Sequence, residues 1–219
     1  MGGRTTAKVV RVADIVRRPL KERSAFVHDL LRHLEARGFR GSPRFKGIDS
    51  LGREVLTFLP GSVPEELGHF SDAQLAAAAR LLRELHDHTT DCSLRGASAI
   101  VCHGDASPCN CVFIDGAPVA FIDFDNAHAG TRIEDVGYAA WLWLDIGNSA
   151  LSAEYQGSRA ANFLTAYGLA PDLAVPAIIA AQKALGARTD SARVRAWSEI
   201  CLAWVQRHKS ALTGSRAAG

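Results

Sequence analysis

A two-residue turn near the middle of the chain limits what this sequence can fold into. Asp115-Gly116 stands between the apolar runs CVFI and APVAFI, and an Asp-Gly pair in such a place is the strongest short-range signal for a β-hairpin. If these two residues form the turn, Ile114 pairs with Ala117, and the register of the two strands follows from that pair. We therefore predict an antiparallel hairpin on either side of Asp115-Gly116.

The open end of this hairpin gathers side chains that carry oxygen. The register places Asn110 opposite Phe121 and Asp123 opposite Pro108, so Asn110 and Asp123 are expected at the same end. An amide oxygen and a carboxylate are hard ligands, which suit Mg²⁺ and suit Zn²⁺ poorly. The sequence therefore predicts a divalent-cation site on Asn110 and Asp123, with Asp105 in the loop that leads into the first strand.

A carboxylate close to a bound cation is the arrangement that phosphoryl transfer requires. The metal neutralises the phosphates of a nucleotide, while a separate aspartate orients the attacking hydroxyl group. The protein supplies mainly positioning and charge stabilisation. Asp105 is the candidate for the separate aspartate, and His103 is expected to brace the loop by hydrogen bonds and not to act as the base.

The residues up to Gly61 form a small unit of strands with one helix in this prediction. Val9–Arg18 is rich in β-branched residues and is interrupted by Ala-Asp, which predicts two short strands. Ser24–Arg37 has helical apolar spacing, its first residue is the expected cap, and Gly38 supplies a left-handed stop. Glu54–Leu59 is predicted as a further strand.

Helical patterns dominate from Pro64 onwards. Ser71-Asp72-Ala73-Gln74 has the pattern of a capping box. Four helices are expected after the hairpin, in RIEDVGYAAWLWL, SAEYQGSRAANFLTAYGL, PDLAVPAIIAAQKAL and SARVRAWSEICLAWVQRH. The predicted fold class is α+β, with residues 1–61 as a small strand-containing lobe and residues 62–219 as a larger, mainly helical lobe.

Charge and hydropathy argue against several classes of protein. The 25 basic and 23 acidic residues are spread along the chain without a basic stripe, so we expect no nucleic-acid partner. No apolar segment is long enough to span a membrane and the N-terminus has no secretory pattern, so a cytoplasmic protein is expected. The five cysteines are then expected to be reduced thiols.

The ordered set of motifs resembles the aminoglycoside phosphotransferase and choline kinase-like enzymes, which are relatives of protein kinases. HGDASPCN matches their catalytic loop H-x-D-x-x-x-x-N, and the following Ile-Asp matches their metal-binding aspartate. EVLTFLPG resembles their last N-lobe strand and hinge, IVRRP their phosphate-gripping strand, and RIEDVGYAAW the segment that ties down the catalytic loop. The resemblance covers Val9 to Trp143 and implies a protein kinase-like two-lobe fold.

This resemblance implies a role for each matching residue of the catalytic segment. Asp105 would be the catalytic base, Asn110 and Asp123 would bind Mg²⁺, and Asp135 would support the catalytic loop. Asp125 is not a requirement of the family, and a role at the metal or substrate and a plain surface role stay equally open for it.

The resemblance also implies a nucleotide site for ATP. Its adenine would lie against the backbone near Phe58 and Leu59, and its phosphates would be gripped by Arg17, which the match of IVR favours over Arg18. In the family this strand residue is a lysine, and arginine is not equivalent to lysine at such a site.

Two departures from the family pattern concern the N-lobe. The chain begins almost where the second strand of the family is expected, and only Gly2-Gly3 remains of a glycine-rich phosphate loop. The helix acid that pairs with the strand cation falls near Val27 or His28, where the sequence has no carboxylate. We therefore expect the contacts that bind the nucleotide to differ from those in the family.

The predicted function is an ATP- and Mg²⁺-dependent transfer of the γ-phosphoryl group to a hydroxyl group of a small molecule. One alternative is a nucleotide-binding pseudokinase or regulatory module without turnover. Another is a haloacid-dehalogenase-like phosphatase with Asp123 as nucleophile, although Ala127 departs from that motif. A third is a metal site on Cys102, His103, Cys109 and Cys111, whose spacing fits no standard zinc site. The sequence specifies neither the phosphoryl acceptor nor the oligomeric state.

Overall fold

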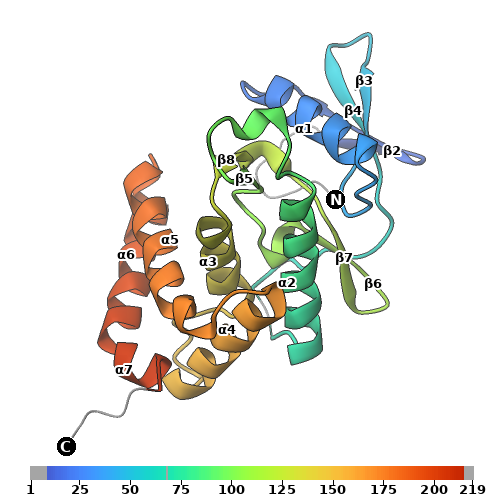
Figure 1. Ribbon diagram of the computed structural model, residues 1–219. Helices are drawn as coiled ribbons and strands as arrows, with labels where there is room; N and C mark the ends of the chain where they lie inside the picture. The colour runs from blue at the N-terminus through green and yellow to red at the C-terminus, as the bar shows by residue number, and fades with distance from the viewer. Residues whose placement is uncertain (1–8, 68, 215–219) are drawn as a thin grey trace, which may run out of the picture.

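The chain folds into a small sheet with one helix, packed on a larger helical part (Figure 1). The computed structural model describes residues 9–67 and 69–214, so Gly2-Gly3 lies outside the described residues. In Figure 1 the sheet and its helix lie at the top right, and the helices of the second half of the chain lie below them. The predicted α+β class is confirmed.

The N-terminal sheet has four antiparallel strands in the order β1-β2-β4-β3. Helix α1 connects β2 to β3 along the chain and lies beside the sheet (Figure 1). The strands are β1 (Val10–Val12), β2 (Ile15–Pro19), β3 (Phe45–Ile48) and β4 (Arg53–Thr57), and the helix is α1 (Ser24–Ala36).

The two ends of α1 show one wrong and one correct prediction. Ser24 does not cap the helix, because its hydroxyl group accepts a hydrogen bond from the Lys21 backbone N–H at 2.8 Å and Arg23 occupies the cap position. Gly38 follows the helix with a φ of 81°, the left-handed conformation that glycine adopts at low cost. The helix is therefore stopped as the sequence predicts but started differently.

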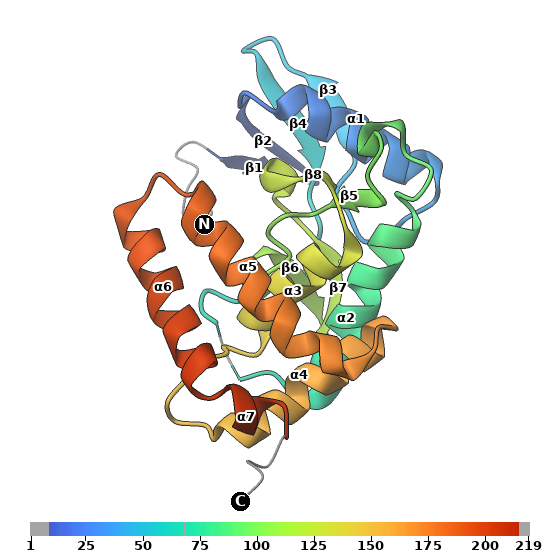
Figure 2. The same ribbon diagram turned by 60° about the vertical axis from the view of Figure 1, so that its left-hand side comes forward.

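The helical part is built around α3, α4 and α5, which share one apolar core (Figure 2). Helix α5 lies between α3 and α6, and α2 packs on α4 and on the hairpin strand β7. The helices are α2 (Asp72–Asp87), α3 (Arg132–Trp143), α4 (Ala153–Tyr167), α5 (Ala174–Arg188), α6 (Ala192–Arg207) and α7 (Lys209–Leu212).

The capping box predicted for α2 is confirmed. The Ser71 hydroxyl group accepts a hydrogen bond from the Gln74 backbone N–H at 3.3 Å, and the Gln74 side chain accepts one from the Ser71 N–H at 2.8 Å. Leu75, Leu82 and Leu85 then face the core along one side of the helix.

Two small antiparallel pairs of strands lie between the sheet and the helices. Strand β5 (Ile100–Cys102) pairs with β8 (His128–Gly130), and β6 (Cys111–Ile114) pairs with β7 (Ala117–Phe121). Short 3₁₀ turns at Pro108–Asn110 and Phe124–Asn126 enter and leave this region. Both pairs are short, so they serve to place the loops at their ends.

The predicted hairpin is confirmed at its turn. Asp115 and Gly116 have φ angles of 50° and 76°, as a tight two-residue hairpin turn requires, and Ile114 pairs with Ala117. Phe113 pairs with Pro118, also as predicted.

The predicted register is wrong beyond these two pairs. Val119 is an extra residue on β7, so Val112 pairs with Ala120 and Cys111 pairs with Phe121. Asn110 consequently lies opposite Ile122, whose N–H donates to the Asn110 carbonyl oxygen at 2.8 Å, and does not lie opposite Phe121. The bulge brings Asn110 one position nearer to Asp123 than the prediction had it.

The segment after β4 is bonded directly to this hairpin. Ser62 exchanges two backbone hydrogen bonds with Phe113, of 2.9 and 2.7 Å. Gly61 has a φ of 140°, and a Cβ atom there would lie 2.4 Å from the Phe113 carbonyl oxygen. A glycine is therefore needed where the connection between the sheet and the helical part passes the hairpin.

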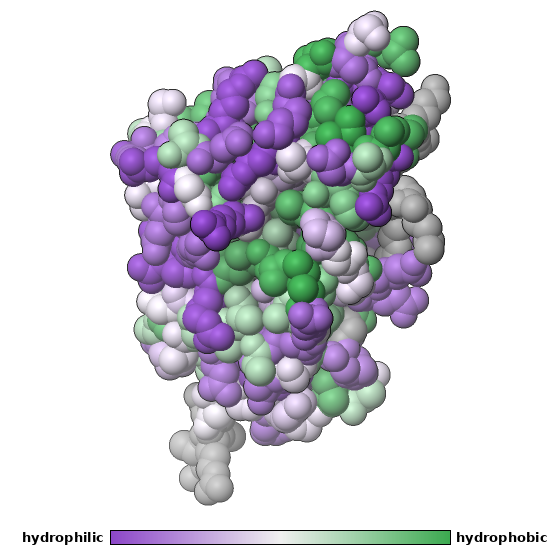
Figure 3. Space-filling view, turned by 90° about the vertical axis from the view of Figure 1, so that its right-hand side faces the viewer, coloured by the Kyte–Doolittle hydropathy of each residue, from purple (hydrophilic) through white to green (hydrophobic). Residues whose placement is uncertain are grey.

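The surface mixes polar and apolar areas. On the side that faces right in Figure 1, apolar residues gather at the top right and in the centre among polar ones (Figure 3). Within the described residues, no helix has the length and apolar character that a membrane crossing requires.

Candidate active site

The loop His103–Asn110 is held by a buried carboxylate in the first turn of α3. Asp135 accepts hydrogen bonds from the backbone N–H groups of His103 at 2.7 Å and Gly104 at 3.0 Å. Both oxygens are used, so the carboxylate fixes the direction in which the loop leaves β5. This is the supporting role that the sequence implied for Asp135.

His86 orients that carboxylate from the other side. Its Nε2 lies 2.9 Å from an oxygen of Asp135, and its Nδ1 lies 2.7 Å from the Tyr167 hydroxyl group. Burial alone would raise the pKa of Asp135, but the hydrogen bond and charge of His86 and the contacts of His103 hold it below its usual value. The sequence analysis missed His86, whose place on the apolar face of α2 marked it only as a core residue.

His103 braces the loop as predicted. Its Nε2 lies 3.1 Å from the Ile122 carbonyl oxygen, and its Nδ1 accepts from the Asp105 N–H at 3.3 Å. Burial lowers the pKa of His103, which keeps the ring neutral with its proton on Nε2. Both ring nitrogens are thus engaged in the protein, and neither is free to bind a metal.

Gly104 allows the loop to pass close to a neighbouring chain segment. Its φ is 77°, and a Cβ atom there would lie 2.2 Å from the Asn126 carbonyl oxygen. After the turn, the Ala106 carbonyl oxygen accepts a hydrogen bond of 2.8 Å from the Trp143 ring N–H. The Asp105 side chain is therefore carried on a backbone that is fixed on both sides.

Asp105 and Asn110 are joined through the loop backbone. The Asn110 side-chain nitrogen donates to the Asp105 carbonyl oxygen at 3.0 Å, which leaves the amide oxygen as the atom available to a cation. Burial and the nearby Asp105 carboxylate raise the pKa of Tyr138, so its hydroxyl group stays protonated beside Asp105. Asp105 is partly exposed, as a residue that meets a substrate has to be.

Asp123 lies just past the open end of the hairpin. It has a left-handed backbone conformation with a φ of 59° and begins the turn Phe124–Asn126. Burial and the neighbouring Asp125 raise the pKa of Asp123. Burial acts to raise the pKa of Asp125 as well, but the hydrogen bonds that Asp125 makes with Asp123 and Lys21 lower it below its usual value. Two carboxyl groups this close favour a cation between them.

Arg18, and not Arg17, supplies the charge that faces these acids. Alternation along β2 turns Arg17 to the other side, where its Nε lies 3.5 Å from Asp49. Arg18 is 7% exposed and donates to Asp123 at 2.8 Å and to Asp125 at 2.6 Å. Arg17, which the sequence analysis favoured for gripping phosphate, does not line the cavity between sheet and hairpin, whereas Arg18 does. Ile15 and Val16 are both apolar, so the sequence left the inward face of the strand undetermined.

Arg18 also has a buried acidic partner that the sequence did not reveal. Its Nε donates to Glu54 at 2.6 Å, and the two residues are directly paired across β2 and β4. His28 of α1 lies 2.7 Å from the other oxygen of Glu54. The acid expected on the helix is thus on a strand, and the helix contributes a histidine to it.

A cavity of about 270 Å³ separates the sheet from the hairpin. Arg18 and Asp123 stand at its polar part, and Phe58 and Leu59, near which the adenine was predicted, also line it. The Phe58 N–H donates to the Asp14 carbonyl oxygen at 2.6 Å, so it is not available to a ligand. Most of the remaining lining is apolar and comprises Val9, Val16, Pro43, Leu56, Thr57, Gly61, Val63, Val112 and Ile122.

Two of the rival interpretations lose their structural basis. A haloacid-dehalogenase-like phosphatase needs a doubly wound parallel sheet, and every strand pair in the described residues is antiparallel. A metal site that includes His103 would need a ring nitrogen that is already used. Of the predicted site residues, Asp123, Phe58 and Leu59 line the cavity, whereas Asp105 and Asn110 lie on the neighbouring loop and do not line it.

Comparison with protein families gives a match over the segment that carries this loop and hairpin. Residues 95–179, which contain the catalytic loop, the hairpin and α3, match the model of the phosphotransferase enzyme family. The trifolitoxin immunity protein of Rhizobium leguminosarum bv. trifolii is 33% identical over 157 residues, which are 64% of this chain and 59% of that protein. The chain thus spans about 59% of the length of this curated relative.

Solved structures share the fold over nearly the whole chain. The GDP complex of aminoglycoside 2'-phosphotransferase-IIIa superimposes with a TM-score of 0.61 at 15% identity, covering 96% of this chain and 91% of that one. A Streptomyces rimosus aminoglycoside phosphotransferase, in complex with ADP and streptomycin, gives 0.58 at 14% identity over 94% and 90%.

A choline/ethanolamine kinase family protein from Mesorhizobium loti has a TM-score of 0.54 at 16% identity, covering 98% of this chain and 91% of that one. These likenesses confirm the predicted protein kinase-like fold, with a small N-terminal sheet and helix and a larger helical part. Residues 95–179 are thus similar in sequence to the phosphotransferase enzyme family, and the described chain shares its fold with these solved structures.

Proposed function

We propose that this protein transfers the γ-phosphoryl group of ATP to a hydroxyl group of a small molecule, with Mg²⁺ as the metal. The observation that carries the proposal is the single cavity that joins Phe58 and Leu59 to Arg18 and Asp123, next to the fixed loop of Asp105. Solved structures of the same fold that hold ADP or GDP support a nucleotide as the donor.

In this proposal the nucleotide lies between two lobes, residues 1–61 and residues 62–219. The apolar walls around Phe58 and Leu59 suit the faces of a purine ring, which is large and largely apolar. Arg18 takes the phosphate-binding role that the sequence analysis gave to Arg17, because Arg18 lines the cavity and Arg17 does not. A guanidinium group binds phosphate oxygens in pairs.

Asn110 and Asp123 are the residues that would hold Mg²⁺. Their amide and carboxylate oxygens are the donor set that this ion prefers, and the raised pKa of Asp123 marks a position that gains from an added positive charge. When bound, the ion neutralises the charge of the phosphates. Asn110 is held for this by its bond to the Asp105 backbone.

Asp105 is the residue that would accept the proton of the substrate hydroxyl group. As that oxygen forms its bond to phosphorus, the bond from phosphorus to the leaving ADP oxygen breaks and the proton moves to the Asp105 carboxylate. The neutral His103 keeps the backbone of Asp105 in place by accepting its N–H. Asp135 and Trp143 fix the same loop from the helical part.

Replacing Asp105 tests this assignment. We expect Asp105→Asn to lower kcat by about 10²–10⁴-fold, the usual contribution of a general base, with the Kd for nucleotide changed less than about threefold. Turnover is measured as labelled phosphate transferred from ATP across aminoglycosides, sugars, amino-alcohols and hydroxy-amino acids, and nucleotide binding by calorimetry. Asp115→Asn is the matched control, because it neutralises an exposed aspartate at the far end of the hairpin. Turnover by Asp105→Asn equal to that of the control would refute the assignment.

The same assay distinguishes the proposed enzyme from a nucleotide-binding module without turnover. ATP consumption with Mg²⁺ is compared between the unmodified protein and Asp123→Ala. If both bind nucleotide but neither consumes it with any acceptor, the module is the better description. Consumption that is lost only in Asp123→Ala supports the enzyme.

A second candidate function follows from the similarity to the trifolitoxin immunity protein, at 33% identity over 157 residues. Protection against a toxin of that kind would make the toxin, or a molecule derived from it, the phosphoryl acceptor. We would express the chain and its Asp105→Asn variant in a strain that trifolitoxin inhibits. Growth restored by the first alone supports phosphorylation as the basis of immunity, growth restored by both supports sequestration, and growth restored by neither excludes this function.

A further inference from the structure

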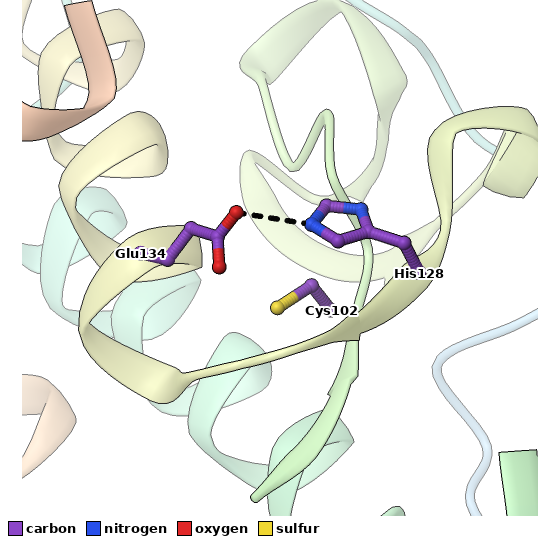
Figure 4. Close-up of side chains that lie close together, drawn as sticks. All are labelled: Cys102, His128 and Glu134. Carbon is purple, nitrogen blue, oxygen red and sulfur yellow. Dashed lines mark hydrogen bonds and ion pairs between the residues drawn. The ribbon is translucent and has the colours of Figure 1, made fainter. Parts of the chain in front are cut away.

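Three side chains with metal-binding groups converge beside the catalytic loop, outside the proposed nucleotide site (Figure 4). Cys102 ends β5, His128 begins β8 opposite it, and Glu134 lies in the first turn of α3. The Cys102 sulfur, one ring nitrogen of His128 and one carboxylate oxygen of Glu134 all lie within 4.8 Å of one another. The sequence analysis expected Cys102 to be a structural thiol and did not connect it with the other two.

The hydrogen bonds of His128 show which of its ring nitrogens faces the other two side chains. Its Nδ1 lies 2.8 Å from the Asn126 carbonyl oxygen, which can only accept, so Nδ1 carries a proton. Its Nε2 lies 3.1 Å from Glu134. Nε2 is therefore the ring nitrogen whose lone pair can bind a metal ion beside the Glu134 carboxylate. Metal-binding histidines commonly donate their other N–H to a backbone carbonyl in this way.

Space for an ion is left by a glycine and by a small adjoining cavity. A Cβ atom at Gly130 would lie 2.7 Å from the Cys102 sulfur and 2.9 Å from an oxygen of Glu134. A cavity of about 10 Å³ is lined by His128, Glu134 and Tyr138 among others, which is room for about one water molecule. Two of the three side chains, His128 and Glu134, therefore border a space that can hold a water molecule, and Cys102 does not line it.

We propose that Cys102, His128 and Glu134 bind one Zn²⁺ ion, with a water molecule in the small cavity as the fourth ligand. One sulfur, one nitrogen and one carboxylate oxygen are ligands that zinc accepts in four-coordinate sites, and a thiolate does not suit Mg²⁺. Zinc bonds of about 2.0–2.3 Å place donor atoms about 3.3–3.8 Å apart. A donor pair near the 4.8 Å limit therefore has to close by about an ångström, whereas His128 Nε2 and the Glu134 oxygen, 3.1 Å apart, have to separate slightly. Binding releases the thiol proton to solvent, and the charges of the thiolate, the carboxylate and the ion then cancel.

The consequence for the fold is a tether at the start of the catalytic loop. Cys102 is followed directly by His103, whose N–H is held by Asp135 in the same turn of α3 that carries Glu134. A zinc ion would join β5, β8 and α3 at one point. This proposal does not depend on the phosphotransferase activity, because its test reads metal binding itself.

Cobalt is the probe, since Co²⁺ replaces Zn²⁺ and is coloured. The full chain without an affinity tag is stripped with a chelator and titrated with Co²⁺ under reducing conditions. We expect one equivalent to bind, with the visible bands of a four-coordinate ion and a thiolate-to-cobalt band in the near ultraviolet, and Zn²⁺ should displace it. Cys102→Ser should lose the thiolate band, whereas Cys201→Ser on α6, remote from the cluster in the fold, should keep it.

Glu134→Gln provides a test that leaves the core intact, because Glu134 is partly exposed while Cys102 is buried. We expect this variant to have an unchanged circular dichroism spectrum and a Zn²⁺ affinity at least tenfold lower, measured by competition with a coloured chelator. The proposal is overturned if the unmodified chain takes up no metal at micromolar concentration. It is also overturned if Cys102→Ser, folded by circular dichroism, keeps the thiolate band.

Discussion

At the scale of single residues, Arg18 holds together more of the site than any other side chain described above. It donates to Glu54, Asp123 and Asp125, which come from a neighbouring strand and from the end of the hairpin. Glu54 has no exposed surface, so its charge depends on Arg18 and on His28. Removing one partner of a buried ion pair leaves an uncompensated charge in a medium that solvates it poorly.

We therefore predict that Arg18→Ala lowers the free energy of unfolding by about 3–5 kcal/mol. Arg17→Ala removes a partly exposed contact with Asp49 and should cost less than about 1 kcal/mol. Urea unfolding at pH 7 measures both. Equal losses for the two neighbours would contradict the distinction drawn between them.

The Asp123 side chain, which the proposed function requires, lowers the stability of the fold when it is ionised. Its pKa is raised by burial and by Asp125. A carboxyl group with a folded pKa above its unfolded value contributes stability below the unfolded pKa, and that contribution is lost as the pH rises through the folded pKa. At pH 7 the ionised Asp123 is therefore a destabilising group.

Asp123→Asn should consequently unfold at the same temperature as the unmodified protein, or at a higher one, without Mg²⁺ at pH 7. It should also lose the rise in Tm that Mg²⁺ and ATP together produce. Thermal unfolding followed by fluorescence, with and without Mg²⁺-ATP, measures both effects. A Tm several degrees lower without ligand, or a full ligand-induced rise, would show that this account is mistaken.

The sequence suggests those candidate site residues whose spacing is local. Asp105, Asn110 and Asp123 lie in one short stretch whose order specifies a loop, a hairpin and its end. Glu54 and His28 were missed because their partnership with Arg18 depends on which strands become neighbours. Such a pairing is a property of the tertiary structure and leaves no local pattern.

At the scale of elements, the hairpin shows where sequence prediction stops. Asp-Gly specified the turn correctly, because few residues adopt two positive φ angles in succession. The bulge at Val119 could not be predicted, since valine is as well suited to a regular strand position as to an extra one. The shifted register is what sets Asn110 beside Ile122.

The contact between Gly61 and the hairpin supports an element-scale prediction. Gly61→Ala would place a Cβ atom 2.4 Å from the Phe113 carbonyl oxygen and would disturb the Ser62–Phe113 hydrogen bonds. Gly116 also has a positive φ, but nothing lies within 4 Å of its Cβ position. Gly116→Ala should cost about 1–2 kcal/mol from backbone strain alone, and Gly61→Ala at least about 1 kcal/mol more. Chemical unfolding of both variants gives the difference, and a Gly116 variant as unstable as the Gly61 variant would argue against it.

At the scale of the whole molecule, the buried group around Asp135 joins distant parts of the chain. His86 of α2, Tyr167 of α4 and the loop after β5 all meet at this carboxylate of α3. The pKa of Asp135 is lowered, so its contribution to stability is present above the unfolded value of about 3.9 and is lost as the pH falls through the folded value.

We expect the unmodified protein to lose stability steeply below about pH 4. Asp135→Asn should be less stable by about 2–4 kcal/mol at pH 7, because an amide offers the two loop N–H groups only one acceptor oxygen. The free energy of unfolding of Asp135→Asn should fall less between about pH 5 and pH 3 than that of the unmodified protein, because the variant lacks the Asp135 carboxylate. Urea unfolding at several pH values measures this, and parallel pH profiles would be inconsistent with the assignment.

The arrangement of the two parts was largely predictable, and their junction was not. A change from strand-like to helical patterns near Pro64 is visible in the sequence, and it corresponds to the observed change from sheet to helices. The junction uses single backbone contacts, such as the Phe121 N–H to the Gly41 carbonyl oxygen at 2.9 Å. Backbone groups are alike in every residue, so such contacts leave no signature in the sequence.

The reach of Arg18 from the sheet to Asp123 and Asp125 has one more consequence. With no ligand present, the protein neutralises its own acidic end with a built-in counter-ion. Under the proposed function, a divalent metal that arrives there with a nucleotide would not meet a free carboxylate and would have to exchange places with the guanidinium group. The displaced guanidinium group would then face the incoming phosphates, so metal binding and nucleotide binding would be coupled in one exchange.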